Sequence, residues 1–145
     1  MDKVITNIQQ GIADEMAIVV LDLIALVEAR VKNQGKNVDG AYFKPYAKKT
    51  VEIRGEAGLQ TSFKDFTFTN TMWRDLDLLE TRIDGGNVVN EVGFRTVRSS
   101  KIYDDNCERE KRQIIEPNKD ELELIGDSVL EWIGEKLDNY GKDNN

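Results

Sequence analysis

Apolar residues recur every three or four positions over residues 3–32, and this spacing predicts one long N-terminal helix. From Met16 to Val27 the apolar positions cover most sides of that helix. A helix that is apolar on most sides is either central to a core or shared between subunits. The window is interrupted by Asp22 and is shorter than the ~20 residues of a bilayer span, which favours a buried helix over a membrane anchor.

A narrower apolar stripe predicts a second, amphipathic helix over about residues 119–139. Asn118 and Glu121 have the spacing of a capping box at its start. The polar residues 141–145 are predicted to form a frayed tail. The stripe consists of Leu122, Ile125, Val129, Trp132, Ile133 and Leu137.

Between these helices the pattern changes to short β-type runs. Residues 78–83 and 88–95 flank a cluster of turn residues, which predicts an antiparallel hairpin. The remaining segments predict a short apolar strand at 66–68, a helical turn at 72–76 capped by Asn70, a weak helix at 97–110 and an edge strand at 114–115. The turn cluster is Asp84, Gly85, Gly86 and Asn87.

The connection after the first helix is rich in turn and breaker residues. Gly35 suits a left-handed helix cap, and Asp39-Gly40 is a turn pair. Pro45 predicts a short helix over 45–50, and residues 51–65 are predicted to form a flexible, irregular loop. The loop residues expected to contact partners are Arg54, Gly55, Glu56 and Gly58.

The order of these elements predicts a single α+β domain over residues 1–145. A small antiparallel sheet is expected, with the long N-terminal helix and the amphipathic C-terminal helix packed on it. No internal repeat and no alternation of strands and helices indicates a parallel sheet.

Composition limits the chemistry that the chain can support. The sequence contains no His and one Cys, Cys107, which argues against a disulfide framework and a zinc site. We therefore predict no metal and no cofactor. The start of the sequence lacks the basic run and apolar core of a signal peptide, so no secretory signal is expected.

The net charge of −7 is unevenly distributed. Residues 30–64 carry eight basic and three acidic side chains, whereas residues 116–145 carry nine acidic and three basic ones. This polarity suits head-to-tail self-association, although two independently solvated faces explain it equally simply.

The sequence argues against two other function classes, an enzyme and a tight nucleic-acid-binding protein. Paired carboxylates occur at Asp75/Asp77 and Asp104/Asp105, but nothing in the pattern indicates burial in distinct environments, and we predict that the chain is not an enzyme. The basic stretch 30–64, with aromatic residues between its lysines, is the one candidate for nucleic-acid binding, and the overall acidity argues against tight binding.

Four short signatures occur in a characteristic order along the chain. They are Gln34-Gly35 with Asp39-Gly40, Phe43 and Pro45-Tyr46; Phe68-Thr69-Asn70-Thr71-Met72-Trp73; Val92-Gly93-Phe94; and Arg112-Gln113-Ile114-Ile115-Glu116-Pro117-Asn118. In this order the chain resembles the small virion-morphogenesis and tail-completion proteins of tailed phages, including the HK97 gp10-like group. The resemblance spans about residues 3–139. Asn70 stands where the family usually has Gly.

The resemblance implies a structural subunit without catalytic activity. Family members form homo-oligomeric rings of six or twelve copies at the head–tail interface, stacked between a portal or head-closure protein and the tail tube. DNA passes through the ring without sequence-specific binding, no membrane is involved, and the protein resides in the virion after assembly in the host cytoplasm. The contact residues expected on this basis are the loop 51–65, the hairpin tip 84–87 and the flank of the first helix at Ile18, Val20 and Leu21.

The rival reading is a non-viral soluble interaction domain that dimerises through its N-terminal helix. The oligomeric state separates the two, because a ring favours the phage reading and a simple dimer favours the rival. A small enzyme is a third reading, which a polar pocket with perturbed carboxylates would support.

Overall fold

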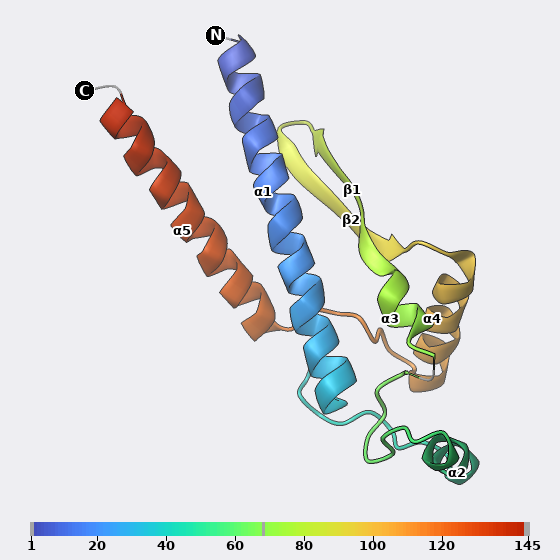
Figure 1. Ribbon diagram of the computed structural model, residues 1–145. Coiled ribbons are helices and arrows are strands. Elements are labelled where there is room, and N and C mark those ends of the chain that lie inside the picture. The colour runs from blue at the N-terminus through green and yellow to red at the C-terminus, as the bar shows by residue number, and fades with distance from the viewer. Residues whose placement is uncertain (1, 68, 144–145) are drawn as a thin grey trace.

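A long helix, α1 (Asp2–Glu28), runs through the middle of the molecule in the computed structural model, which describes residues 2–67 and 69–143 (Figure 1). It continues directly into a π-helical turn, η1 (Ala29–Asn33), so the helix predicted over 3–32 is confirmed. The other elements are α2 (Lys48–Glu56), α3 (Thr71–Asp75), β1 (Leu76–Asp84), β2 (Asn87–Phe94), α4 (Val97–Glu110) and α5 (Lys119–Asp143). The predicted α+β class is confirmed.

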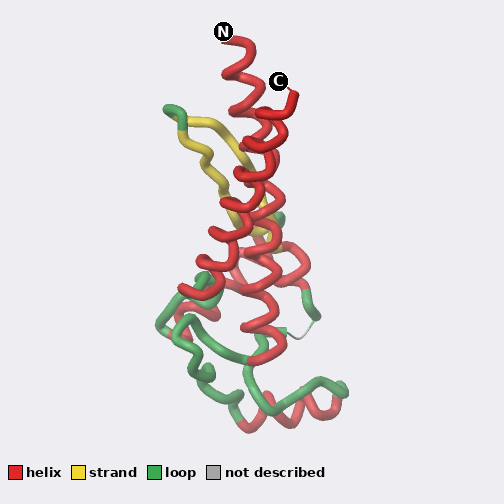
Figure 2. The backbone as a smooth tube through the Cα atoms, turned by 90° about the vertical axis from the view of Figure 1, so that its left-hand side faces the viewer, coloured by secondary structure: helices red, strands yellow, loops and turns green. Residues whose placement is uncertain are grey.

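The two long helices and the hairpin lie side by side, with α1 in the centre (Figure 1). Helix α5 packs on α1 on the side away from the hairpin, and it runs back toward the end where α1 begins. The predicted packing of the N-terminal helix on the sheet is found, whereas the expectation that the C-terminal helix also packs on the sheet was wrong. Figures 1 and 2 both place α2 at the end of the molecule opposite the two termini. The half that carries the termini therefore consists of α1, α5 and the hairpin alone.

The hairpin forms where turn residues separate the two β-type runs. Strands β1 and β2 pair antiparallel from Leu76 with Phe94 to Asp84 with Asn87, and the turn uses positive φ angles at Gly85 and Gly86. The register shifts between Leu78 and Glu80, which makes the intervening Leu79 an extra residue in β1. A Cβ atom at Gly93 would lie 2.8 Å from the Leu79 side chain, so the glycine gives that side chain room.

The hydrophobic core lies at the C-terminal half of α1, where α3, α4 and the segment before α5 meet. Met72 and Trp73 are buried there, and the Trp73 indole N–H donates to the Asp65 carbonyl at 3.0 Å. Phe43 packs edge-on against Phe66, with ring centroids 4.8 Å apart. The cluster consists of Val27, Val31, Phe43, Met72, Trp73, Leu76 and Ile114.

Three turn and cap assignments made from the sequence are confirmed. Gly35 and Gly40 have φ angles of 65° and 79°. Asn70 precedes α3 in the left-handed conformation, but its side chain makes no capping hydrogen bond, so the predicted cap was wrong. The capping box is formed: the backbone N–H of Glu121 donates to the Asn118 side chain at 2.8 Å, and the N–H of Asn118 donates to the Glu121 carboxylate at 2.9 Å.

The segment 45–65 differs from the prediction. The helix expected over 45–50 begins at Lys48 and continues to Glu56, so residues 51–56 are helical and not part of a loop. Gly55 lies inside the last turn. Arg54 explains the difference, because its buried guanidinium bonds to residues beyond the helix and holds that last turn in place. The irregular loop therefore begins after α2, at Ala57.

Three smaller expectations were wrong. Phe66 adopts a φ angle of 56° and is not in a strand, while Phe68 lies outside the described residues. Residues 114–115 form no edge strand; Ile114 lies in an irregular segment and is buried in the core. The expected frayed tail is helical as far as Asp143, and only residues 144–145 of it lie outside the described part of the chain. Within the described residues, no helix combines the length and hydropathy needed to span a bilayer.

Candidate functional site

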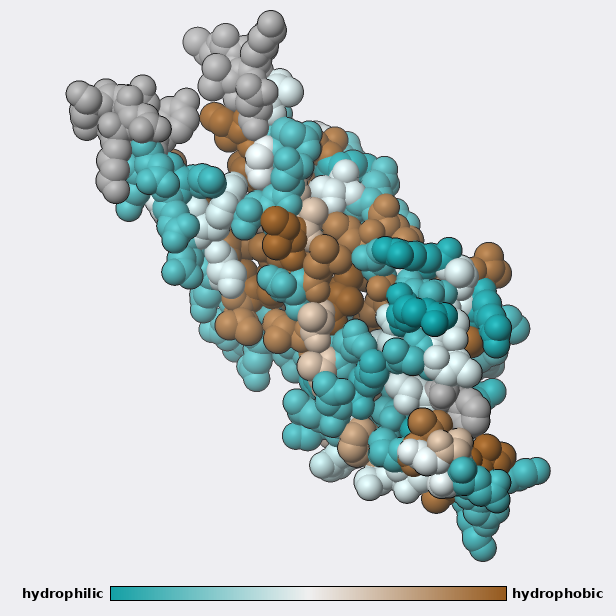
Figure 3. All heavy atoms as spheres, viewed as in Figure 1, coloured by the Kyte–Doolittle hydropathy of each residue, from teal (hydrophilic) through white to brown (hydrophobic). Residues whose placement is uncertain are grey.

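The two long helices expose apolar side chains that the rest of the molecule does not cover. On α1 an exposed stripe of residues steps by three and four positions, and it includes Ile18 (55% exposed) and Leu21 (45% exposed). Figure 3 shows hydrophobic residues gathered along the middle of α1 and beside it. The stripe consists of Gly11, Asp14, Ile18, Leu21 and Ala25.

A groove between α1 and α5 adds to this uncovered surface. It has a volume of about 540 Å³ and is lined almost entirely by apolar side chains. Farther along α5, Leu130 is 68% exposed. Both helices thus carry apolar stripes wider than the contact between them. The groove is lined by Ile8, Gly11, Ile12, Trp132, Ile133, Lys136 and Leu137.

The residues predicted to contact partners fall into three separate places. Ile18 and Leu21 are exposed on α1, whereas Val20 is half-buried. The turn residues 84–87 are exposed at the hairpin tip, at the other end of the molecule from α2 (Figure 1). The structure therefore does not join these predicted contacts into one site.

Within the segment 51–65, the predicted contact residues differ in accessibility. Arg54 is only 1% exposed, so the expectation that it contacts a partner was wrong. Gly55 and Glu56 are exposed but helical, and Gly58 is exposed in the turn that follows. The segment offers a short helix and its following turn as a surface.

A closed polar network explains why Arg54 is buried. Its Nη2 lies 3.0 Å from Asp65 Oδ2, its Nε donates to the Gln60 carbonyl at 2.9 Å, and its Nη1 donates to the Thr67 carbonyl. The Tyr46 hydroxyl donates to Asp65 at 2.7 Å, and the ring lies under the guanidinium at 4.5 Å. Tyr46 thus helps to hold the segment 60–67 in place.

The pKa shifts in this network fit a structural role. Burial is the largest influence on Asp65 and raises its pKa, but hydrogen bonds from Gln60, Thr67 and Tyr46 outweigh it and leave the pKa below the ordinary 3.8. Burial, followed by the hydrogen bond to Asp65, raises the pKa of Tyr46 to about 12. Asp65 is thus a charged acceptor and Tyr46 a neutral donor, which is unlike a pair exchanging protons near neutral pH.

This lowered pKa predicts a contribution to acid sensitivity. A carboxylate with a depressed folded pKa stabilises the fold fully above its unfolded pKa, and this stabilisation is lost as the pH falls through the folded value. We expect Asp65→Asn to destabilise the protein at pH 7 and to flatten the loss of stability between about pH 5 and pH 2. Urea unfolding across that range measures the effect.

Asp104→Asn serves as the control for this pH profile, because Asp104 is exposed on α4 and is in no ion pair with another described residue. It should leave the pH profile of the wild type unchanged. An Asp65→Asn profile parallel to that of the wild type would contradict the assignment.

Asp75, from the first of the paired carboxylates, also has a structural role. Asp75 accepts hydrogen bonds from the hydroxyls of Thr96 and Ser99, each at 2.7 Å, and these bonds lower its pKa, that from Thr96 most. Thr96 in turn accepts from the Ser99 N–H as the N-cap of α4. Asp75 therefore ties α3 to the start of α4.

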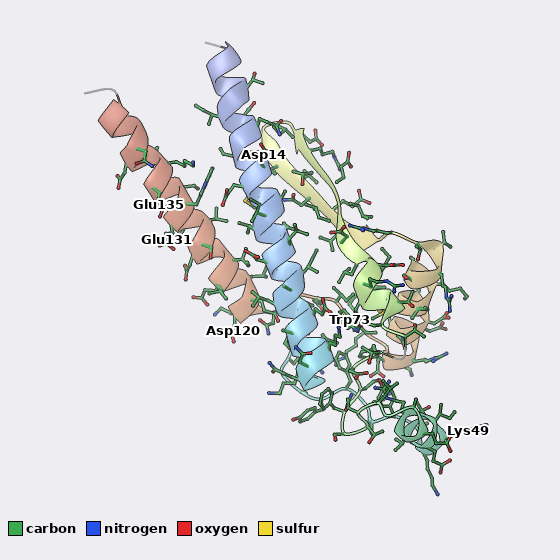
Figure 4. The ribbon with its side chains drawn as sticks, in the orientation of Figure 1. Asp14, Lys49, Trp73, Asp120, Glu131 and Glu135 are labelled. Carbon is green, nitrogen blue, oxygen red and sulfur yellow. The ribbon has the colours of Figure 1, made fainter. Side chains whose placement is uncertain are left out.

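Ion pairing reduces the basic character of residues 30–64. Arg30 pairs with Glu121, Lys32 with Glu28, Arg54 with Asp65 and Lys64 with Glu110. Half of the eight basic side chains in this stretch are thus neutralised within the chain. Several acidic side chains of α5 remain exposed, among them Asp120, Glu131 and Glu135 (Figure 4).

Sequence reasoning missed the ion pair that attaches α5. Arg30 Nε lies 2.7 Å from Glu121 Oε1, and the two side chains are 8% and 9% exposed. The sequence pattern placed Arg30 only in the basic stretch 30–64 and Glu121 only in the capping box. An arginine on the buried face of a helix was the available signal, because such a cation needs a partner.

Neither metal-binding groups nor similar proteins add information about the site. The described residues include no group of three or more His, Cys, Asp or Glu side chains placed to hold a metal ion. Among these residues every buried side-chain nitrogen and oxygen has a hydrogen-bond partner. Comparison of the chain with protein-family models, curated protein sequences and solved structures gives no match.

Proposed function

We propose that this protein is a structural subunit that assembles with copies of itself into a ring at the head–tail interface of a tailed-phage virion. One observation supports self-assembly: in the half of the molecule that carries the termini, α1, α5 and the hairpin lie side by side in one layer. Domains normally bury apolar faces between at least two packed layers. In the proposed ring, the neighbouring subunit supplies the missing layer over Ile18 and Leu21.

The phage setting of the ring rests on the resemblance carried by the four sequence signatures. In that setting the subunit contacts a portal or head-closure protein on one side and the tail tube on the other. The exposed carboxylates of α5, among them Glu131 and Glu135, face the channel and repel the passing DNA, which keeps it mobile. No covalent chemistry is required.

The oligomeric state of the purified protein tests the proposal. We expect a mass of six or twelve subunits by sedimentation and annular particles in negative-stain micrographs. The variant Ile18→Glu/Leu21→Glu places two charges on the uncovered stripe. Because each apolar side chain contributes about 2 kcal/mol when buried, we expect assembly to weaken by about a hundredfold or more.

The control variant is Val97→Glu, since Val97 is an exposed apolar residue at the start of α4, outside the stripe. It should assemble like the wild type. A ring that tolerates both glutamates on α1 would place the interface elsewhere. A protein that stays monomeric at high concentration would contradict self-assembly.

The alternative function is an interaction domain that dimerises through α1. The same exposed stripe supports it, because steps of three and four residues suit the pairing of two helices. Sedimentation distinguishes the two: a dimer that the double glutamate variant dissociates favours the interaction domain, and a closed ring favours the virion subunit.

A further inference from the structure

A second pocket, with a mixed polar and apolar lining, lies far from the apolar groove, between the start of α2, the segment 64–72 and α4. Its volume is about 370 Å³. Among the described residues that line it are three cations, Arg54, Lys64 and Arg109, and no Asp or Glu. Asp65 and Glu110 neutralise Arg54 and Lys64 from outside this lining, so Arg109 carries the unpaired positive charge of the pocket, in a chain whose net charge is −7.

Two of the three cations are held in fixed positions. Arg54 is tied to Asp65 and to the carbonyls of Gln60 and Thr67. Lys64 forms an ion pair with the buried Glu110, a residue that does not line the pocket. These contacts give the pocket a rigid wall, and the backbone bonds use donors without adding negative charge to the lining.

The third cation, Arg109, has no partner among the described residues. Arg109 lies in the last turn of α4, is exposed, and makes no hydrogen bond or ion pair with any described residue. Its guanidinium offers a planar fork of donors, which matches two oxygens of one anion. Thr50, in the first turn of α2, likewise has a hydroxyl with no partner among the described residues.

The start of α2 strengthens the same positive potential. The first N–H groups of any α-helix lack intrahelical partners, and at the start of α2 the N-cap residue Ala47 supplies no side-chain acceptor for them. Both Ala47 and Thr50 line the pocket. Free N–H groups at a helix start favour nearby negative charge, and here they lie at the same pocket as the unpaired Arg109.

We propose that this pocket binds a phosphate group, with Arg109 as its principal ligand. The volume accommodates a small phosphorylated molecule and lies within the range of ligand pockets. The phosphate comes either from such a small molecule or from the backbone of DNA, and both present the same oxygens. The inference is independent of ring assembly, because the pocket lies within one subunit and away from the stripe on α1.

Amide NMR shifts recorded during titration with sodium phosphate at pH 7 test the site. Sodium chloride at matched ionic strength is the reference titration. We expect phosphate to shift the amides around Thr50, Thr67 and Arg109 in a saturable manner. Arg109→Ala should weaken binding by about tenfold or more, as for the loss of a charged hydrogen bond.

Arg98→Ala is the matched control, because Arg98 is an exposed cation on the same helix that does not line the pocket. It should bind phosphate like the wild type. Equal shifts with phosphate and chloride, or equal weakening by the two variants, would overturn the site.

A short single-stranded oligonucleotide identifies the source of the phosphate. If it displaces phosphate from the same amides, and Arg109→Ala weakens it equally, the site binds the DNA backbone. If phosphate and pyrophosphate bind while the oligonucleotide does not, the site is specific for a small phosphorylated ligand.

Discussion

Arg54→Ala is expected to lower the free energy of unfolding by about 3–5 kcal/mol, the range for breaking a buried ion pair on one side. The Arg54 side chain is 2% exposed and that of Asp65 is 6% exposed, so water does not replace the lost partner. Removal of the guanidinium leaves the Asp65 carboxylate without its cation and the Gln60 and Thr67 carbonyls without their donor. Urea unfolding followed by circular dichroism measures the loss.

Lys49→Ala is the matched control for this experiment, because Lys49 is a cation of the same helix with an exposed side chain (Figure 4). It should change stability by less than about 0.5 kcal/mol. Arg54→Lys should recover only part of the loss, since an ammonium group keeps the charge but cannot reproduce the guanidinium fork. A loss of under about 1 kcal/mol for Arg54→Ala would show that the network is dispensable.

Arg30→Ala is expected to destabilise the protein by a similar amount, about 3–5 kcal/mol, and to loosen α5 selectively. Besides its bond to Glu121, the Arg30 guanidinium donates to the Glu116 carbonyl at 2.6 Å and to the Lys36 carbonyl at 3.0 Å. One side chain thus joins the end of α1, the turn that follows it and the start of α5. This junction therefore contributes to the attachment of α5 in addition to its packing on α1.

Hydrogen exchange of the α5 amides measures the selective effect, and it should accelerate far more than exchange in α3 and α4. Lys32→Ala is the control, because Lys32 is two residues away and its pair with Glu28 is about one-third exposed. Unchanged exchange in α5 after Arg30→Ala would contradict the role of this ion pair.

Glu121→Gln separates the charge from the geometry. Glutamine keeps an acceptor for the Asn118 N–H but removes the charge that faces Arg30. We expect a destabilisation smaller than that of Arg30→Ala, because fewer buried partners are lost. This comparison apportions the attachment of α5 between the capping box and the ion pair.

Local patterns predicted the elements whose residues repeat with a clear period. The helix over 3–32, the hairpin around 84–87 and the C-terminal helix after Asn118 were all indicated by spacing and turn chemistry. The expected loop at 51–56 was wrong because the contacts of Arg54 hold these residues in α2. Those contacts come from residues 60–67, which a local window does not include.

The candidate site divides in the same way. The exposure of Ile18 and Leu21 was indicated by an apolar pattern wider than one sheet can cover. The pocket proposed to bind phosphate was not indicated by the sequence. Arg109, Lys64 and Thr50 line one pocket only because the fold brings α4, the segment 64–72 and α2 together. Arg54 illustrates the opposite error, since a charged residue in a polar segment was expected to be exposed and is buried.

The sequence by itself determined the α+β class, the long first helix, the hairpin and the caps, because periodicity and turn chemistry act over a few neighbouring residues. The tertiary structure alone decided which charges are paired. Arg30 with Glu121 and Arg54 with Asp65 were decided by packing, because a buried charge is stable only beside a partner that the fold brings to it. The same packing left the apolar stripe of α1 uncovered and Arg109 beside a pocket without acidic residues.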